Sequence, residues 1–201
     1  AYGEAADIAD FYVAMHALAA GVDPKQPMAP QLQQIAHQAR LALPANQYPA
    51  KMYDFVWYLY QAGIPWEAAR DQLYQRYQLE AKDGYEITGK KLYCNGCFAA
   101  GINFAASLVS LFYGEGDMQE TIKIAVLAGW DSDNPAATWG GLYGFMLGKT
   151  GVEQAFGRTF SSKFNIHRTR KGFANNGIAD FAQMAEKATA IVDQVMIQQL
   201  A

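Results

Sequence analysis

The sequence predicts an all-α fold, and three observations support that prediction. Apolar residues recur at the i, i+3, i+4, i+7 spacing of a buried helix face over several long segments, whereas strand-like alternation is confined to one short stretch. Glycine and proline fall at the ends of these segments, where helices begin and end. Of the 201 residues, 51% are hydrophobic and 17% are charged, which is typical of a packed core with a polar surface. We therefore expect a single all-helical domain over residues 1–201.

Four helices are expected in the first part of the chain. The first covers residues 3–20 and ends at Gly21, and a weaker one covers residues 30–43. Pro49 and Pro65 open the third and fourth, because proline fits the first turn of a helix. These helices should bury one apolar stripe each.

Aromatic side chains are concentrated in residues 52–77. Such residues usually cover helix contacts in a core. One alternative is that Trp57 and the neighbouring tyrosines form a groove for an adenine ring. Another is a surface that binds a partner, which keeps a helical partner-binding domain open as a function.

Residues 80–97 are expected to be irregular, with a short strand at 85–88. Cys94 and Cys97 form a C-x-x-C pattern. A thioredoxin-like redox site would need a βαβ unit, and zinc would need two further ligands, whereas the three histidines are scattered. Two buried thiols or a local disulfide remain as alternatives.

A strong helix is expected over residues 98–113. Asn103, Ser107 and Ser110 form a polar stripe along this otherwise apolar segment. The stripe either borders a ligand cleft or bonds neighbouring helices and water. In the first case Asn103 is a substrate-binding candidate.

The stretch that organises the chain lies between two predicted helices. Asp117 and Glu120 have the spacing of an N-cap and its third-position partner, so a helix should begin there. Asn134 is a candidate N-cap and Pro135 fits the first position of the next helix. Residues 131–133 should therefore form a tight turn at the positive end of that helix.

The turn carries two carboxylates, Asp131 and Asp133. Buried carboxylates need a cation or strong hydrogen-bond donors, and hard cations prefer oxygen ligands. The turn therefore predicts a metal site. The alternative is an Asp-x-Asp turn that only caps a helix and is solvated.

Glycines recur after the turn at positions 140, 144 and 148. They are expected to give one helix a flat face against which a neighbour packs closely, which would hold the turn rigidly. A final helix should bury an apolar seam that contains Phe181, Met184, Ala188, Ile191 and Val195.

A basic cluster lies within residues 157–173. Its cations are Arg158, Lys163, His167, Arg168, Arg170 and Lys171. The cluster is a candidate for contact with a diphosphate, a nucleic acid or an acidic partner, and the alternative is a solvated loop.

The run from Gly129 to Asn134, Gly-Trp-Asp-Ser-Asp-Asn, followed by an Ala- and Gly-rich segment to Gly144, resembles the C-terminal signature of the ADP-ribosylglycohydrolases. It is most similar to a subgroup with this hexapeptide. The resemblance implies a compact orthogonal multi-helix bundle and hydrolysis of the bond joining ADP-ribose to a protein side chain or a small acceptor. It also implies two Mg²⁺ ions, or Mn²⁺, with Asp131, Asp133 and Asn134 as ligands, and Trp130 in the substrate pocket.

The sequence departs from that family in three respects. Asn134 replaces a hydroxyl residue, Trp130 replaces a glycine, and no Thr-Asp-Asp motif occurs in the 201 residues. We expect the chain to be the C-terminal half of a longer domain, with an N-terminal half as a partner that completes the metal site. The alternative is a catalytically inactive relative that serves as a binding or structural module.

The overall charge argues against two classes of partner. The formal net charge of −3 provides no global attraction to nucleic acid or to an anionic membrane. The sequence contains no run of 18 apolar residues of the kind that spans a bilayer.

Overall fold

The computed structural model describes residues 2–87, 90–166 and 171–199. The chain divides into two compact units, Ala1–Phe156 and Gly157–Ala201. Each unit is described by itself, so the expectation of one domain over the whole chain stays a prediction.

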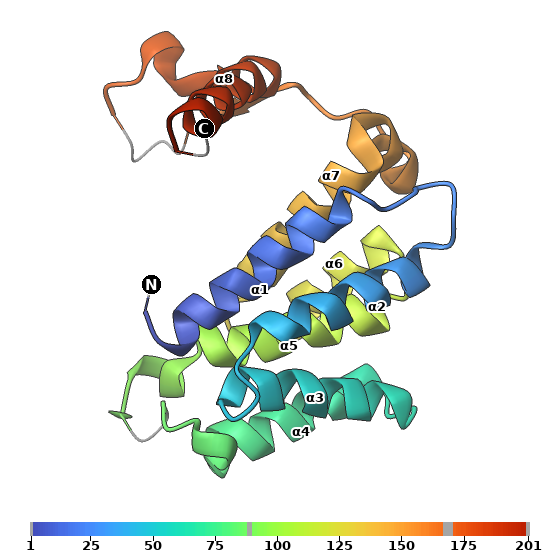
Figure 1. Ribbon diagram of the computed structural model, residues 1–201, viewed down its shortest axis with the longest axis vertical. Coiled ribbons are helices and arrows are strands. Elements are labelled where there is room, and N and C mark those ends of the chain that lie inside the picture. Colours follow the sequence, from blue (N-terminus) through green and yellow to red (C-terminus); the bar gives the residue numbers. More distant parts are fainter. Residues whose placement is uncertain (1, 88–89, 167–170, 200–201) are drawn as a thin grey trace. The chain divides into compact units, whose positions relative to one another are not determined.

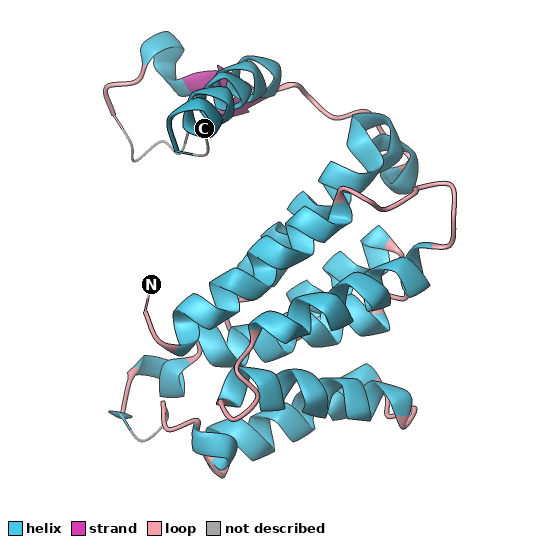
Figure 2. Cartoon of the chain, viewed as in Figure 1, coloured by secondary structure: helices cyan, strands magenta, loops and turns pink. Residues whose placement is uncertain are grey.

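The first unit is built from helices, as Figures 1 and 2 show. They are α1 (Glu4–Ala19), α2 (Met28–Ala39), α3 (Tyr48–Gln61), α4 (Trp66–Leu73), α5 (Ala100–Tyr113), α6 (Met118–Leu127) and α7 (Asp133–Phe156). Short 3-10 turns lie at Arg40–Ala42, Lys82–Gly84 and Tyr93–Gly96, and a π-helical segment, η2 (Tyr74–Leu79), continues α4. The all-α prediction is confirmed.

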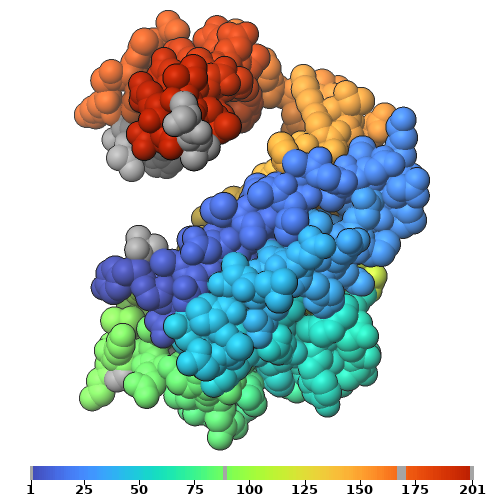
Figure 3. Space-filling model, viewed as in Figure 1, coloured from blue at the N-terminus to red at the C-terminus, as the bar shows by residue number. Residues whose placement is uncertain are grey.

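Helix α5 is the centre of this unit. Every residue from Gly101 to Phe112 is buried, and the helix contacts α1, α2, α3, α4, α6 and α7. Helices α1 and α2 lie side by side on the face that Figure 3 shows in dark and light blue. A segment buried on all sides must be apolar or internally satisfied, which explains the composition of α5.

Aromatic rings fill much of the core, as expected from their abundance. Phe11 packs edge-to-face on Phe104 with ring centroids 5.0 Å apart, and Tyr53 packs on Phe112 at 5.6 Å. Trp139 is fully buried, and its indole N–H donates a hydrogen bond of 2.8 Å to the carbonyl oxygen of Ser107. These contacts join helices that are far apart in sequence.

The predicted start of α6 is confirmed. The side chain of Asp117 accepts a hydrogen bond of 2.8 Å from the backbone N–H of Glu120. Helix α7 begins two residues before the prediction, because Asp133 is already helical and Asn134 lies inside the first turn. The carbonyl oxygen of Ser132 accepts the N–H of Ala136, so the helix ladder begins at Ser132, two residues before the predicted N-cap Asn134.

Two local expectations are wrong. No strand forms at residues 85–87, and Thr88 lies outside the described residues. The glycines of α7 do not form a flat packing face: no neighbouring atom lies within 4 Å of a Cβ placed on Gly144, and Gly148 breaks the helix with φ 64° and ψ 175°. That conformation is open almost only to glycine, so Gly148 marks a kink.

The second unit contains a short hairpin and a helix. Strands β1 (Lys163–Asn165) and β2 (Ile178–Asp180) pair antiparallel, with Phe164 opposite Ala179, and the 3-10 turn η6 (Ala174–Gly177) precedes β2. Helix α8 (Phe181–Gln199) follows directly (Figure 2). The sheet was not predicted, because each strand has only three residues.

The apolar seam predicted for α8 is not buried within this unit. Its exposed side chains include Phe181, Met184, Ile191 and Val195. Within the described residues of this unit nothing covers these side chains, and the burial of the seam in the whole protein stays a prediction. In the basic cluster, the guanidinium of Arg158 lies 4.8 Å from the ring centre of Phe160, whereas His167, Arg168 and Arg170 lie outside the described residues.

Within the described residues, no helix combines the length and the apolar character that a membrane crossing requires.

Candidate functional site

The Asp131–Asp133 turn connects α6 to α7, and its entry is conformationally unusual. Gly129 and Trp130 have φ of 96° and 57°. Positive φ is uncommon for a bulky residue such as tryptophan, so other contacts must hold Trp130 in place. Asp131 follows directly, two residues before α7 begins at Asp133.

Backbone and side-chain hydrogen bonds fix Asp131. Its N–H donates a hydrogen bond of 3.0 Å to Oδ1 of Asn103 in α5, and its carbonyl oxygen accepts the N–H of Asn134 at 3.0 Å. The position of Asp131 is therefore set by the central helix and by the first turn of α7 together.

Among the described residues, the carboxylates of the turn have no partner. Asp131 is half-buried and Asp133 is exposed, and neither carboxylate accepts a hydrogen bond or forms an ion pair within the part of the chain that the structure describes. Two ionised carboxylates with free oxygens are hard ligands that remain available to a cation.

The amide group of Asn103 makes its hydrogen bonds within the protein. Its Nδ2 group donates to the carbonyl oxygens of Cys97, at 2.8 Å, and Ala99, at 3.0 Å, while Oδ1 accepts from Asp131. Both amide hydrogens are thus occupied, and the side chain is only 5% exposed. The structure gives Asn103 a positioning role, and its predicted contact with substrate stays a prediction.

Trp130 is held by a residue that the sequence did not single out. Its indole N–H donates a hydrogen bond to Oε1 of Gln78, and Nε2 of Gln78 donates to the carbonyl oxygen of Asn95 at 3.2 Å. Gln78 belongs to the π-helical segment η2 and is 5% exposed. A glutamine next to Tyr77, on the buried side of a helix, is the signal that would have identified it, because buried amides must find partners.

A shallow cleft of about 390 Å³ opens beside the turn. Its lining residues are Arg70, Asp71, Tyr74, Leu127, Ala128, Gly129 and Trp130. Trp130 thus forms part of the cleft wall and is also the residue directly before Asp131 in the chain. Its predicted place in a substrate pocket fits this arrangement, although substrate contact itself stays a prediction.

A comparison with known families decides the classification. A family model described as ADP-ribosylglycohydrolase matches residues 2–187. The chain belongs to the ADP-ribosylglycohydrolase family. The resemblance read from residues 129–144 is confirmed at the level of the family, and the subgroup stays a prediction. No curated protein and no solved structure matches the chain.

The metal ligands predicted for this ADP-ribosylglycohydrolase fit a hard cation in kind, but they make an incomplete set. Asp131, Asp133 and Asn134 offer carboxylate and amide oxygens, whereas Mg²⁺ takes six ligands. Within residues 2–87, 90–166 and 171–199, no group of three or more His, Cys, Asp or Glu side chains is placed to hold a metal ion. That water, substrate or another polypeptide supplies further ligands stays a prediction.

The polar stripe of α5 bonds the protein to itself. The hydroxyl of Ser107 donates to the carbonyl oxygen of Phe104 at 2.7 Å and lies 2.8 Å from the hydroxyl of Tyr12. The hydroxyl of Ser110 donates to the carbonyl oxygen of Ser107 at 2.8 Å. Of the two alternatives for this stripe, the structure supports bonding between and within helices.

Cys94 and Cys97 are joined by a disulfide. This resolves the alternative between two thiols and a local cross-link. The carbonyl oxygens of Asn95 and Cys97 in this loop are the acceptors for Gln78 and Asn103. Through these two side chains the C-x-x-C loop is linked to Trp130 and Asp131, at the start of the motif turn, although Trp130 lies 33 positions after Cys97 in the sequence.

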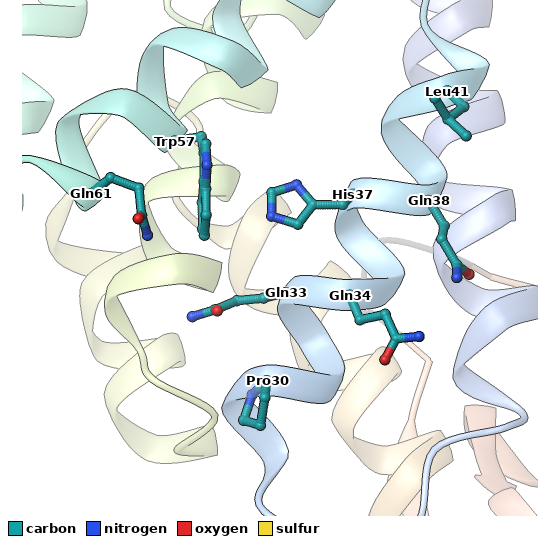
Figure 4. A pocket seen from close by; sticks show the side chains of 8 residues that line it. All are labelled: Pro30, Gln33, Gln34, His37, Gln38, Leu41, Trp57 and Gln61. Carbon is teal, nitrogen blue, oxygen red and sulfur yellow. The ribbon is translucent and has the colours of Figure 1, made fainter.

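A second hollow lies between α2 and α3, and Figure 4 shows it. It has a volume of about 610 Å³ and is lined by Pro30, Gln33, Gln34, His37, Gln38, Leu41, Trp57 and Gln61. The ring of His37 meets Trp57 edge-to-face at 4.4 Å, and its Nδ1 lies 2.8 Å from the hydroxyl of Tyr53. No residue of the motif turn lines this hollow, and its use by adenine or a protein partner stays a prediction.

Proposed function

We propose that this ADP-ribosylglycohydrolase is a metal-dependent hydrolase that cleaves the glycosidic bond between ADP-ribose and a protein side chain or a small acceptor. The observation that carries the proposal is the pair of carboxylates in the turn before α7, Asp131 and Asp133, which have no partner among the described residues. Family membership supports the reaction class. Asn103 and Gln78 support the site, because they hold the turn in one conformation.

Asp131, Asp133 and Asn134 would hold Mg²⁺, or Mn²⁺, through hard oxygen donors. When bound, two such ions would supply positive charge that orients hydroxyls of the ribose and a water, as metal ions do in other hydrolases. Asn103 accepts the backbone N–H of Asp131, so it positions this half-buried residue and leaves the carboxylate free to bind an ion.

The cleft beside the turn would receive part of the ADP-ribosylated substrate. Trp130 and Tyr74 provide flat apolar surfaces, and Arg70 provides a positive charge near one wall, although Arg70 also pairs with Asp71 at 2.7 Å. A flat apolar surface suits the base of a nucleotide diphosphate, and a cation suits its phosphates. We assign no catalytic base within this chain.

The incomplete ligand set leads us to propose a partner as well. A second polypeptide segment, equivalent to the N-terminal half of the family's domain, would complete the metal shell. Neither nucleic acid nor a membrane is part of the proposal, since the net charge of −3 gives no reason for one.

Titration calorimetry with Mg²⁺ and Mn²⁺ tests the metal site on the purified chain. Asp131→Asn should abolish binding with little change in fold, because it is nearly isosteric. Asp10→Asn is a matched control, because Asp10 is exposed on α1 and should leave affinity unchanged. Equal affinities for the protein and for Asp131→Asn would overturn the assignment.

A second candidate function is a catalytically inactive binding or structural module. It is favoured by the same observation that limits the first proposal, namely that the described residues hold no cluster of three or more acidic, His or Cys ligands. Release of ADP-ribose from an ADP-ribosylated protein, measured with Mg²⁺ and the upstream polypeptide present, separates the two. Binding of ADP-ribose without release would support the module.

A further inference from the structure

The C-x-x-C loop and the motif turn are joined by two buried side chains. Asn103 links the carbonyl oxygen of Cys97 to the N–H of Asp131, with bonds of 2.8 and 3.0 Å. Gln78 links the carbonyl oxygen of Asn95 to the indole of Trp130. Two adjacent residues of the turn are therefore each held by a side chain that also holds the loop.

Both linking side chains are buried. Asn103 and Gln78 are each 5% exposed, so water is not at hand to replace a lost partner. A buried amide that loses one acceptor must rotate or leave a polar group unsatisfied. A displacement of the loop carbonyls is consequently passed to Trp130 and Asp131.

The cross-link includes a residue with an unusual backbone conformation. Cys94, Asn95 and Gly96 have φ of 45°, 54° and 74°, three successive residues in the left-handed region. Asparagine and glycine adopt this region readily, and Asn175, Asn176 and Gly177 form the same run without a cross-link, so Cys94 is the residue that needs a further constraint. The disulfide closes this turn, with the Cα atoms of Cys94 and Cys97 5.5 Å apart.

The disulfide is also open to chemical attack. Cys94 is exposed and Cys97 is half-buried, so a thiolate from solution can reach the Sγ of Cys94. Reduction by a dithiol breaks the S–S bond and adds two electrons and two protons to the two sulfurs. The dithiol is oxidised to its own disulfide, which balances the step.

We propose that the Cys94–Cys97 disulfide is a redox-sensitive clamp on the Trp130–Asp131 turn, and that Asn103 and Gln78 are the positioning residues that connect them. In the oxidised protein the loop carbonyls hold both amides and the turn is fixed. After reduction, Cys94 leaves the left-handed region, Gln78 loses its acceptor in the loop, Asn103 keeps only the carbonyl oxygen of Ala99, and the turn loosens. The consequence for metal affinity rests on the function proposed above, whereas the clamp itself does not.

The indole N–H signals of the four tryptophans in a ¹⁵N-labelled protein test the clamp. Trp130 and Trp139 provide a matched pair, because each donates its indole N–H to a buried oxygen. Only the acceptor of Trp130, Gln78, is itself hydrogen-bonded to the C-x-x-C loop. Trp130→Phe and Trp139→Phe assign the two signals. Complete reduction by dithiothreitol is verified by a mass increase of two hydrogens.

Reduction should shift the Trp130 signal and leave the Trp139 signal in place. Gln78→Met should show a displaced Trp130 signal in the oxidised protein and no further change on reduction. Cys94→Ser combined with Cys97→Ser should reproduce the reduced position without reductant. A Trp130 signal that does not move after verified reduction would overturn the clamp, and so would equal shifts of Trp130 and Trp139. Failure of oxidised glutathione to re-form the Cys94–Cys97 disulfide in the reduced protein would also overturn it.

Calorimetry with Mg²⁺ on the oxidised and reduced proteins separates this inference from the proposed function. Weaker binding to the reduced protein would support both. A reduction-dependent Trp130 shift with no Mg²⁺ binding in either state would leave the clamp standing and remove the metal site. Equal Mg²⁺ affinity together with a stationary Trp130 signal would remove the clamp alone.

Discussion

The backbone N–H of Asp131 and Oδ1 of Asn103 form a hydrogen bond of 3.0 Å that ties the motif turn to the central helix α5. The bond spans 28 residues of sequence. It holds the backbone of Asp131 and leaves the carboxylate free. If Asp131 binds metal as proposed, Asn103 orients a ligand, and replacing such an orienting residue typically costs about 10- to 100-fold in metal affinity.

Replacing Asn103 by leucine should therefore lower both stability and metal affinity. The substitution leaves the Asp131 N–H and the Cys97 carbonyl oxygen without partners in a buried region, which should cost about 1–3 kcal/mol of unfolding free energy. Affinity for Mg²⁺ should fall about tenfold or more. Urea denaturation and calorimetry on the same preparation measure the two effects.

Ser110→Ala is the control for Asn103→Leu. Ser110 lies on the same helix and is fully buried, and it donates one hydrogen bond to the carbonyl oxygen of Ser107. Its loss should cost about 1 kcal/mol and leave metal affinity unchanged. Similar affinity losses in both variants would mean that destabilisation, and not positioning, lowers binding.

Removing the cap of α6 should destabilise the first unit. Asp117 accepts the N–H of Glu120 at 2.8 Å, so Asp117→Ala exposes an unsatisfied donor and should cost about 1 kcal/mol in urea denaturation. Asp117→Ser keeps an accepting oxygen and should recover most of that loss. Equal destabilisation by alanine and serine would contradict a capping role.

The helix boundaries near Asp117 were predictable because capping depends on residues three apart. The same holds for the first helix, predicted at 3–20 and observed at Glu4–Ala19, where the spacing of Ile8, Phe11 and Met15 carries the information. Local patterns also identified the pair Asp131 and Asp133. These predictions needed no knowledge of tertiary contacts.

The connection between Asn103 and Asp131 was not predictable from spacing. It arises only because α5 packs against α6 and brings residues 28 positions apart together. The link from Gln78 to Trp130 spans 52 residues and depends on a π-helical turn that no simple periodicity indicates. Asn103 was singled out for its polarity in an apolar helix, but its partners come from tertiary structure.

Stability should depend on pH through His37. Partial burial of the ring lowers the pKa of His37 below its ordinary value of 6.5. The unfolded chain therefore binds the proton first as the pH falls, so the contribution of His37 to stability is complete above about 6.5 and is lost toward its lower folded pKa. His37→Gln should reduce the loss of unfolding free energy between pH 7 and pH 5.

The exposed histidine of α1 provides the comparison. His16→Gln leaves the contact of His37 with Trp57 and Tyr53 intact, so the part of the pH dependence that comes from His37 should remain. Parallel urea titrations at several pH values measure both variants. If His37→Gln kept the full pH dependence, another group would be responsible for it.

Two glycines of α7 should respond to alanine in opposite directions. Gly148 has φ 64° and ψ 175°, a conformation nearly restricted to glycine, so Gly148→Ala should cost about 1–3 kcal/mol. Gly144 is helical, and a Cβ added to it would meet no neighbouring atom within 4 Å, so Gly144→Ala should gain about 1 kcal/mol from helix propensity. Urea denaturation of both variants measures the difference. Destabilisation by Gly144→Ala would show that a neighbour does pack closely on this face, whereas a neutral Gly148→Ala would show that α7 continues without a kink.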